Sequence, residues 1–172
     1  MTADDAGLDR LNRLSDDEAS ASLRAACASS AWVSAMLSGR PFADRPSLLD
    51  LSEGTLAKLD WADVLEALAA HPRIGERMAG TGREAAWSAR EQSGTATSTD
   101  AVRDGLIEAN RAYEDRFGHV FLIFATGKTD ASMLAAAQSR LANDEATEQA
   151  VVRSELAQIV TLRLNRLLDE AP

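Results

Sequence analysis

Hydrophobic residues recur every three or four positions along most of the chain, which is the spacing of helices with one buried face. A capping box at Ser15-Asp-Asp-Glu18 predicts the start of a helix that runs to about Ala28. The same spacing, with its caps and breakers, predicts further helices at 32–37, at 47–59 with Ser47 as a candidate cap, from Asp60 to 68, at 84–93, at 102–117, from Thr129-Asp130 onward, and at 144–168. We therefore expect an all-α fold, a single-domain helical bundle of about seven to nine helices.

Two places break this pattern. Val120-Phe-Leu-Ile-Phe124 is a strongly apolar run that fits either an extended segment or a buried helical turn, and it is too short to cross a membrane. His71 precedes Pro72, and proline disfavours helical geometry in the residue before it. His71 is therefore expected where a helix ends, followed by a glycine-containing loop to Gly82.

Composition agrees with one helical domain. The chain has 172 residues, of which 45% are hydrophobic and 5% aromatic, and alanine and leucine dominate. This is enough apolar side chain for one core of ordinary size. We expect a single domain over residues 1–172, with its core at about 11–168 and with residues 1–10 flexible.

Charge excludes some partners. The net charge is -9, the isoelectric point is about 4.7, and no run of basic residues could neutralise a phosphate backbone, so nucleic acid is not expected as a partner. An anionic substrate would need a positive group inside its pocket. Met1 to Arg10 has neither a secretory signal nor a membrane span, and Cys27 stands alone, so a reducing cytoplasm without membrane attachment is expected.

The last predicted helix places an arginine on its apolar stripe. Arg163 falls inside an arc of roughly 100° that also holds Val152, Leu156, Ile159, Val160 and Leu167. A buried guanidinium is costly unless it is paired, so Arg163 should meet a carboxylate or a bound anion. An arginine that reaches past the core to solvent is the alternative.

A second helix carries a polar cluster beside a tryptophan. Trp87, Ser88, Glu91 and Gln92 are three or four positions apart, which places a hydroxyl, a carboxylate and an amide along one face. A solvated helix face is the more common meaning of such a pattern.

Histidine is the remaining candidate for acid–base chemistry. Only His71 and His119 are present, and neither has a second histidine or a cysteine at ligand spacing, so no metal site is expected. A histidine before a proline is more often structural than catalytic, but its neutral-range pKa makes His71 the best general acid or base in the chain. Nucleotide-binding and serine-hydrolase motifs are absent.

Three separated motifs together resemble the family of OHCU decarboxylases, which act in uric acid degradation. They are His71-Pro-Arg-Ile-Gly-Glu76, Trp87-Ser-Ala-Arg-Glu-Gln92, and Asn110-Arg-Ala-Tyr113 running into Phe117-Gly-His-Val-Phe-Leu-Ile123. Their order and spacing also match, and the resemblance extends from about Leu11 to Leu168.

The resemblance implies conversion of 2-oxo-4-hydroxy-4-carboxy-5-ureidoimidazoline to (S)-allantoin by a carboxy-lyase that needs no metal and no organic cofactor. It implies catalytic roles for His71, Glu91 and Arg163. It also implies substrate contacts from Pro72, Ser88, Gln92 and an amide-lined loop, Phe121, Leu122, Ile123, Phe124 and Ala125. The family is generally dimeric, so a homodimer is expected.

One stretch departs from the family pattern. Some relatives carry an arginine after the apolar loop, where this chain has Ala125-Thr126-Gly-Lys128, and this puts anion binding there in doubt. No partner suggests itself for His119, which we interpret as structural or as a neighbour of the site.

Two other functions compete with the decarboxylase. A hydrolase of a ureide or hydantoin ring could use His71 and Glu91 to activate water. A helical interaction module without catalysis would leave the candidate residues unrelated. The agreement of three motifs favours the decarboxylase, and whether His71 or Glu91 moves the proton stays open.

Overall fold

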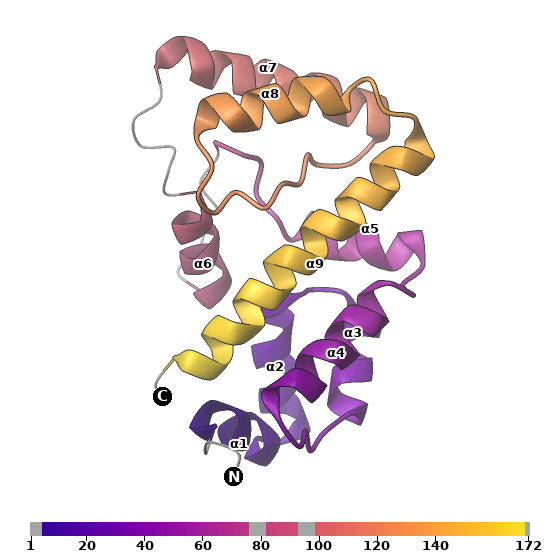
Figure 1. Cartoon of the computed structure of the whole chain (residues 1–172), viewed down its shortest axis with the longest axis vertical. Helices are drawn as coiled ribbons and strands as arrows, with labels where there is room; N and C mark the ends of the chain where they lie inside the picture. The colour runs from indigo at the N-terminus through magenta and orange to yellow at the C-terminus, as the bar shows by residue number, and fades with distance from the viewer. Residues whose placement is uncertain (1–4, 76–81, 93–98, 171–172) are drawn as a thin grey trace. The chain divides into compact units, whose positions relative to one another are not determined.

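The computed structural model describes residues 5–75, 82–92 and 99–170, and within these ranges it contains nine α-helices and no strand (Figure 1). This confirms the all-α prediction. The helices are α1 (Ala6–Arg13), α2 (Asp16–Ala26), α3 (Ser30–Ser38), α4 (Arg45–Leu56), α5 (Trp61–Ala69), α6 (Arg83–Glu91), α7 (Asp100–Phe117), α8 (Asp130–Arg140) and α9 (Glu145–Asp169).

Local caps set most of the helix ends. Ser15 and Glu18 form the predicted capping box at the start of α2, and the Thr129 hydroxyl caps α8. Gly118 ends α7 in the left-handed conformation, at φ 76°. The end predicted for the helix at 84–93 falls at residue 93, which lies outside the described residues.

One expectation about a helix start was wrong. Asp44, not Ser47, caps α4, because the Asp44 carboxylate accepts the Ser47 N–H at 2.8 Å. Pro46 is tolerated in the first turn of that helix, where its missing N–H costs no hydrogen bond. Residues 6–10, expected to be flexible, belong to α1, and the buried side chain of Leu8 anchors this helix.

The chain divides into two compact units, so the expectation of a single domain stays a prediction. The first unit comprises Met1–Ala67 and Ala157–Pro172, and the second comprises Leu68–Leu156. In the first, α3 packs against α2 and α4 around the buried Trp32, whose indole N–H donates to Ser52 at 3.1 Å. Arg45 in this unit pairs with Asp5 and with Asp169, both at 2.8 Å.

The second unit is built on α7 and α8, which lie side by side (Figure 1). Between them and the irregular segments of the unit lies one apolar cluster, made of Ile74, Leu106, Ala109, Tyr113, Phe121, Ile123, Ala125, Met133 and Ala137. Burial of such side chains contributes roughly 1.5–3 kcal/mol each. Residues from both irregular segments, at 74 and at 121–125, therefore belong to the core of this unit.

A buried carboxylate joins the helices of the second unit. Glu148, in the first turn of α9, is 1% exposed and accepts hydrogen bonds from Tyr113 on α7, from Arg140 Nε on α8 at 2.8 Å, and from Asn143 at 2.8 Å. Burial alone would raise the pKa of Glu148, but the hydrogen bonds from Arg140, Tyr113 and Asn143 outweigh it and hold the pKa below the ordinary 4.5. The carboxylate is therefore ionised and fully engaged at neutral pH.

Glu148→Gln is expected to lower the free energy of unfolding at pH 7 by about 3 kcal/mol, because it leaves the Arg140 guanidinium buried without its counter-charge. A carboxyl group with a depressed pKa stabilises the fold above its unfolded pKa and loses that contribution as the pH falls through its folded pKa. The difference between wild type and variant should therefore shrink below about pH 4.5. Urea unfolding at pH 7, 5 and 4 measures it.

Glu145→Gln is the matched control, since Glu145 lies exposed in the same first turn of α9. It should change stability by no more than about 0.5 kcal/mol. A Glu148→Gln difference that is small at pH 7, or equal at all three pH values, would contradict the ionised-cluster account.

Candidate functional site

The candidate site lies in the second unit, and His71 stands at its beginning. As predicted, His71 follows directly on a helix end: α5 stops at Ala69, and the His71 N–H donates to the Leu68 carbonyl at 2.9 Å. The His71 side chain is half-buried, and its Nε2 atom is shielded from solvent. The imidazole is therefore held against the protein rather than extended into water.

Helix α7 holds the residues after His71. The Asn110 side chain donates to the Ile74 carbonyl at 2.9 Å, and Arg73 forms a bidentate pair with Glu114 at 2.6 and 3.0 Å. Asn110 was part of a sequence motif without an assigned role. In the structure its role is to restrain the segment that carries His71, because its buried amide donates a hydrogen bond to the main chain at Ile74.

Helix α6 turns its polar cluster inward. Trp87, Ser88 and Glu91 are buried, at 1%, 4% and 8% exposure, so the solvated-face alternative is wrong. The Gln92 carboxamide oxygen, just after α6, accepts the Gly75 N–H at 3.1 Å. The structure thus joins the end of α6 to the segment that begins at His71.

The apolar run at 121–125 has no helical structure, which settles the alternative that the sequence left open. The side chains of Phe121, Ile123 and Ala125 all belong to the apolar cluster, whereas Leu122 and Phe124 between them do not. Alternation with a period of two is the property of an extended backbone. The segment is therefore extended, although no strand pairs with it among the described residues.

Charged side chains bind the peptide groups of residues 122 and 124. The Leu122 carbonyl accepts from Arg140 Nη1 at 2.7 Å. The Phe124 N–H donates to the Glu155 carboxylate at 2.5 Å, and the Phe124 carbonyl accepts from Lys128 Nζ at 2.6 Å. In an extended backbone the N–H and C=O of one residue point to the same edge, and neighbouring residues point to opposite edges. All three charged groups therefore lie along one edge, which we call the clamped edge.

The other edge of this segment, the open edge, carries the peptide groups of residues 121, 123 and 125. The N–H and C=O of Ile123 and the N–H of Ala125 have no hydrogen-bond partner among the residues that the structure describes. Both residues are buried, at about 5% exposure. Buried main-chain groups are nearly always paired, so these three groups need a partner other than the described residues, such as a ligand.

Arg163 belongs to the first unit. It is 1% exposed, and its Nη1 atom lies 3.5 Å from the Ala25 carbonyl. The stripe predicted for α9, Val152, Leu156, Ile159, Val160 and Leu167, is buried throughout. The alternative of an arginine that reaches solvent is therefore wrong, and the prediction of a buried guanidinium is confirmed.

His119 packs among aromatic rings. Its ring meets Tyr113 edge-on, at 5.5 Å between centroids, and its Nδ1 atom lies 3.1 Å from the Val120 carbonyl, as an Nδ1–H donor would. This fits the structural interpretation of His119.

Sequence reasoning missed four of the residues that shape the site: Lys128, Arg140, Glu148 and Glu155. Each is a charged residue in a helical or turn context where charge is ordinary. Their partners lie at Phe124, Leu122 and Tyr113, up to 35 residues away in the sequence. A buried Arg140 and a buried Glu148 give no periodic signal that would have singled them out.

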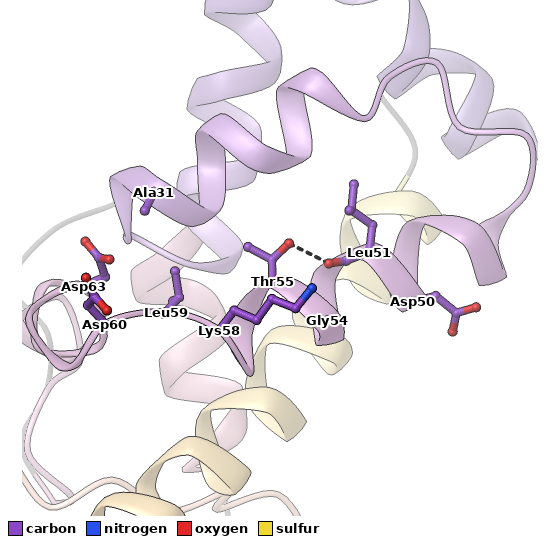
Figure 2. Close-up of a pocket in the computed structure, with 9 residues that line it drawn as sticks. All are labelled: Ala31, Asp50, Leu51, Gly54, Thr55, Lys58, Leu59, Asp60 and Asp63. Carbon is purple, nitrogen blue, oxygen red and sulfur yellow. Dashed lines mark hydrogen bonds between the residues drawn. The ribbon is translucent and has the colours of Figure 1, made fainter.

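A hollow of about 530 Å³ in the first unit does not coincide with these residues (Figure 2). Its walls come from the start of α3, from α4, from the connection after α4 and from the start of α5. The lining residues are Ala31, Asp50, Leu51, Gly54, Thr55, Lys58, Leu59, Asp60 and Asp63. Three carboxylates against one lysine repel an anion. This hollow therefore does not suit an anionic substrate, and none of the predicted site residues lines it.

Among the described residues, no three histidine, cysteine, aspartate or glutamate side chains are grouped so that they could hold a metal ion. None of the described helices combines the length and the apolar character that a membrane span requires.

The comparisons with known proteins agree with one another. The family model described as OHCU decarboxylase matches residues 12–165. The Arabidopsis thaliana protein named uric acid degradation bifunctional protein TTL is 30% identical over 147 residues, which cover 84% of this chain but 45% of that protein. The Haloferax volcanii protein named 2-oxo-4-hydroxy-4-carboxy-5-ureidoimidazoline decarboxylase is 27% identical over 162 residues, which cover 91% of this chain and 93% of that protein.

Two solved structures share the fold. A crystal structure of an OHCU decarboxylase in the presence of (S)-allantoin matches with a TM-score of 0.75 and 28% identity, over 91% of this chain and 100% of that one. A crystal structure of an (S)-allantoin synthase matches with a TM-score of 0.71 and 20% identity, over 94% of this chain and 54% of that one, and this supports the fold alone. Because the family model spans all but the ends of the sequence, the chain belongs to the OHCU decarboxylase family.

Proposed function

We propose that this protein converts 2-oxo-4-hydroxy-4-carboxy-5-ureidoimidazoline to (S)-allantoin and carbon dioxide, in the degradation of uric acid. Membership of the family supports the decarboxylase activity, and the names of the Arabidopsis and Haloferax relatives support the pathway and the substrate. The single observation that carries the proposal in this structure is the open edge at Ile123 and Ala125.

The open edge suits the chemistry of this substrate. When the bond to the carboxylate breaks, carbon dioxide leaves and its electron pair passes into the conjugated system of the ring. Main-chain N–H donors in a dry site stabilise such charge, in the manner of an oxyanion hole, by roughly 3–4 kcal/mol for each donor. The Ile123 N–H and C=O together offer a donor beside an acceptor, which complements a ring amide. The Phe124 N–H already donates to Glu155 and is therefore not one of these donors.

We assign the proton chemistry to the segment at His71 and to the buried face of α6. His71 would orient the substrate carbon and deliver a proton to one face of the ring, which sets the configuration of allantoin. Glu91 would accept hydrogen bonds from the hydroxyl or ureido group, with Ser88 beside it. Because its oxygen is bound to Gly75, Gln92 would present its NH₂ group to the substrate.

Two further contacts complete the assignment. Pro72 restricts the main chain at His71 and would form part of the apolar wall around the ring. Arg163 would bind the negative charge of the substrate, the role that the resemblance of its helix to the family implies. The proposed reaction uses only side chains and main-chain groups of the protein.

Substrate generated in situ from urate tests the proposal directly. Wild type should form optically active (S)-allantoin, followed by circular dichroism, faster than the spontaneous reaction forms racemic product. His71→Ala should lower kcat by at least about 100-fold, the usual contribution of a general acid or base. Arg163→Met should lower kcat/KM by a similar factor, because a charge-assisted contact to the reacting anion is lost.

His119→Gln is the matched control, since His119 packs against Tyr113 and is not assigned to the site, and it should keep its activity. Release of carbon dioxide with the ureido group retained separates a decarboxylase from a ring hydrolase. If the wild-type protein does not form allantoin faster than the spontaneous reaction, the proposal is contradicted and a binding module without catalysis is favoured.

We also propose that the protein is a cytoplasmic homodimer, on the basis of its family membership. Light scattering on the purified protein should give a mass of twice the 18.4 kDa chain, at concentrations down to the micromolar range. A mass equal to that of one chain under these conditions would refute the dimer and leave the proposed reaction untouched.

A further inference from the structure

Arg140, Lys128 and Glu155 take part in no proposed chemical step, yet all three bind the main chain at 121–125. Charged side chains at 2.5–2.7 Å from peptide groups are stronger partners than neutral ones. An apolar segment could instead be held by packing alone. Packing therefore does not explain why three charged side chains bind a segment of only five residues.

The geometry of the peptide groups explains why charged side chains are used here. Among the described residues the cis peptide bond is at Arg40-Pro41, so the bonds at 122–123 and 124–125 are trans. In a trans peptide the C=O and the N–H point in opposite directions. Arg140 holds the Leu122 carbonyl and thereby directs the Ile123 N–H, and Lys128 holds the Phe124 carbonyl and thereby directs the Ala125 N–H.

Each cation also acts on the peptide that it binds. A positive charge on the carbonyl oxygen draws electron density from the peptide and strengthens its N–H as a donor, an effect that a low-dielectric surrounding increases. Arg140 lies over the Phe121 ring at 4.6 Å and is fixed by the Glu148 carboxylate. Lys128 lies over the Phe124 ring at 5.4 Å. Both cations are therefore held in place.

Glu155 fixes the peptide between the two. Its carboxylate accepts the Phe124 N–H, which belongs to the 123–124 peptide and points away from the open edge. The three consecutive peptides from 122 to 125 are thus each bound by one charged side chain, with signs in the order cation, anion, cation. Rotation of any of them would break a charge-assisted bond.

We propose that Arg140, Glu155 and Lys128 are positioning residues, a charged clamp that aims the N–H groups of Ile123 and Ala125 at the substrate and strengthens them as donors. This inference rests on the proposed function. It assigns roles to three residues that lie on the clamped edge and do not touch the substrate.

Kinetics of paired variants test the clamp. Lys128→Met and Glu155→Ala should each raise KM and lower kcat, so that kcat/KM falls by about 10- to 100-fold, because donors displaced by a fraction of an ångström lose most of their effect. The enantiomeric excess of allantoin should fall as well, measured at enzyme concentrations that give equal total rates. Lys128→Arg and Glu155→Gln, which restore a donor and an acceptor, should recover most of the activity.

Lys58→Met and Glu145→Ala are the matched controls. Lys58 is the other lysine of the chain and is exposed, and Glu145 is exposed on the helix that carries Glu155. Loss of folded protein alone would lower the apparent kcat but leave KM and the enantiomeric excess unchanged, so these two readouts separate positioning from stability. Arg140 variants are not used, because they break the buried pair with Glu148.

The outcomes distinguish the two proposals. If wild type does not exceed the spontaneous rate, the proposed function fails, and the clamp fails with it. If wild type is active but Lys128→Met and Glu155→Ala keep the KM, kcat and enantiomeric excess of their controls, the clamp alone is overturned. Activity that is lost equally in Lys128→Arg and Lys128→Met would also overturn it, because the arginine restores the donor.

Discussion

The ionised Glu148 carboxylate is the interaction on which the second unit depends. It accepts from Tyr113 on α7, from Arg140 on α8 and from Asn143 in the turn before α9, so that three helices meet at one buried charge. Burial of a charge is costly, and an apolar replacement is often as stable. What an apolar replacement could not do is hold the guanidinium of Arg140 at the Leu122 carbonyl. Through Glu148 and Arg140, the packing of these helices thus fixes the orientation of the peptide group between residues 122 and 123.

That orientation links the fold to the proposed chemistry. An extended segment without a neighbouring strand has two edges of peptide groups, and in water-free surroundings both need partners. Here charged side chains take the edge of residues 122 and 124, which leaves the edge of Ile123 and Ala125 for a ligand. The His71 segment is restrained in a similar way, by Asn110 and Glu114 on α7 and by Gln92 after α6. Side chains that lie on the helices or close to their ends thus position both irregular segments of the unit.

The sequence predicts what is local and misses what is distant. Capping at Ser15 and Thr129, the helix end before His71 and the buried stripe around Arg163 all depend on residues within a few positions of one another. The cap of α4 was predicted at Ser47 instead of Asp44 because both residue types cap helices, and the sequence alone does not say which of the two begins the helix. The run at 121–125 had two interpretations, because five apolar residues fit either geometry. Its partners Arg140 and Glu155 lie 18 and 31 positions from their contacts, beyond the reach of any periodicity.

The most direct measurement of the central claim, that the open edge binds the ligand, is a titration of the protein with (S)-allantoin followed by the amide resonances of residues 121–125. The account predicts that the Ile123 and Ala125 N–H signals move to lower field with a common saturation curve, because they gain an acceptor, while the Phe124 N–H, already bound to Glu155, stays in place. Movement of the Phe124 signal with no change at Ile123 and Ala125 would contradict it.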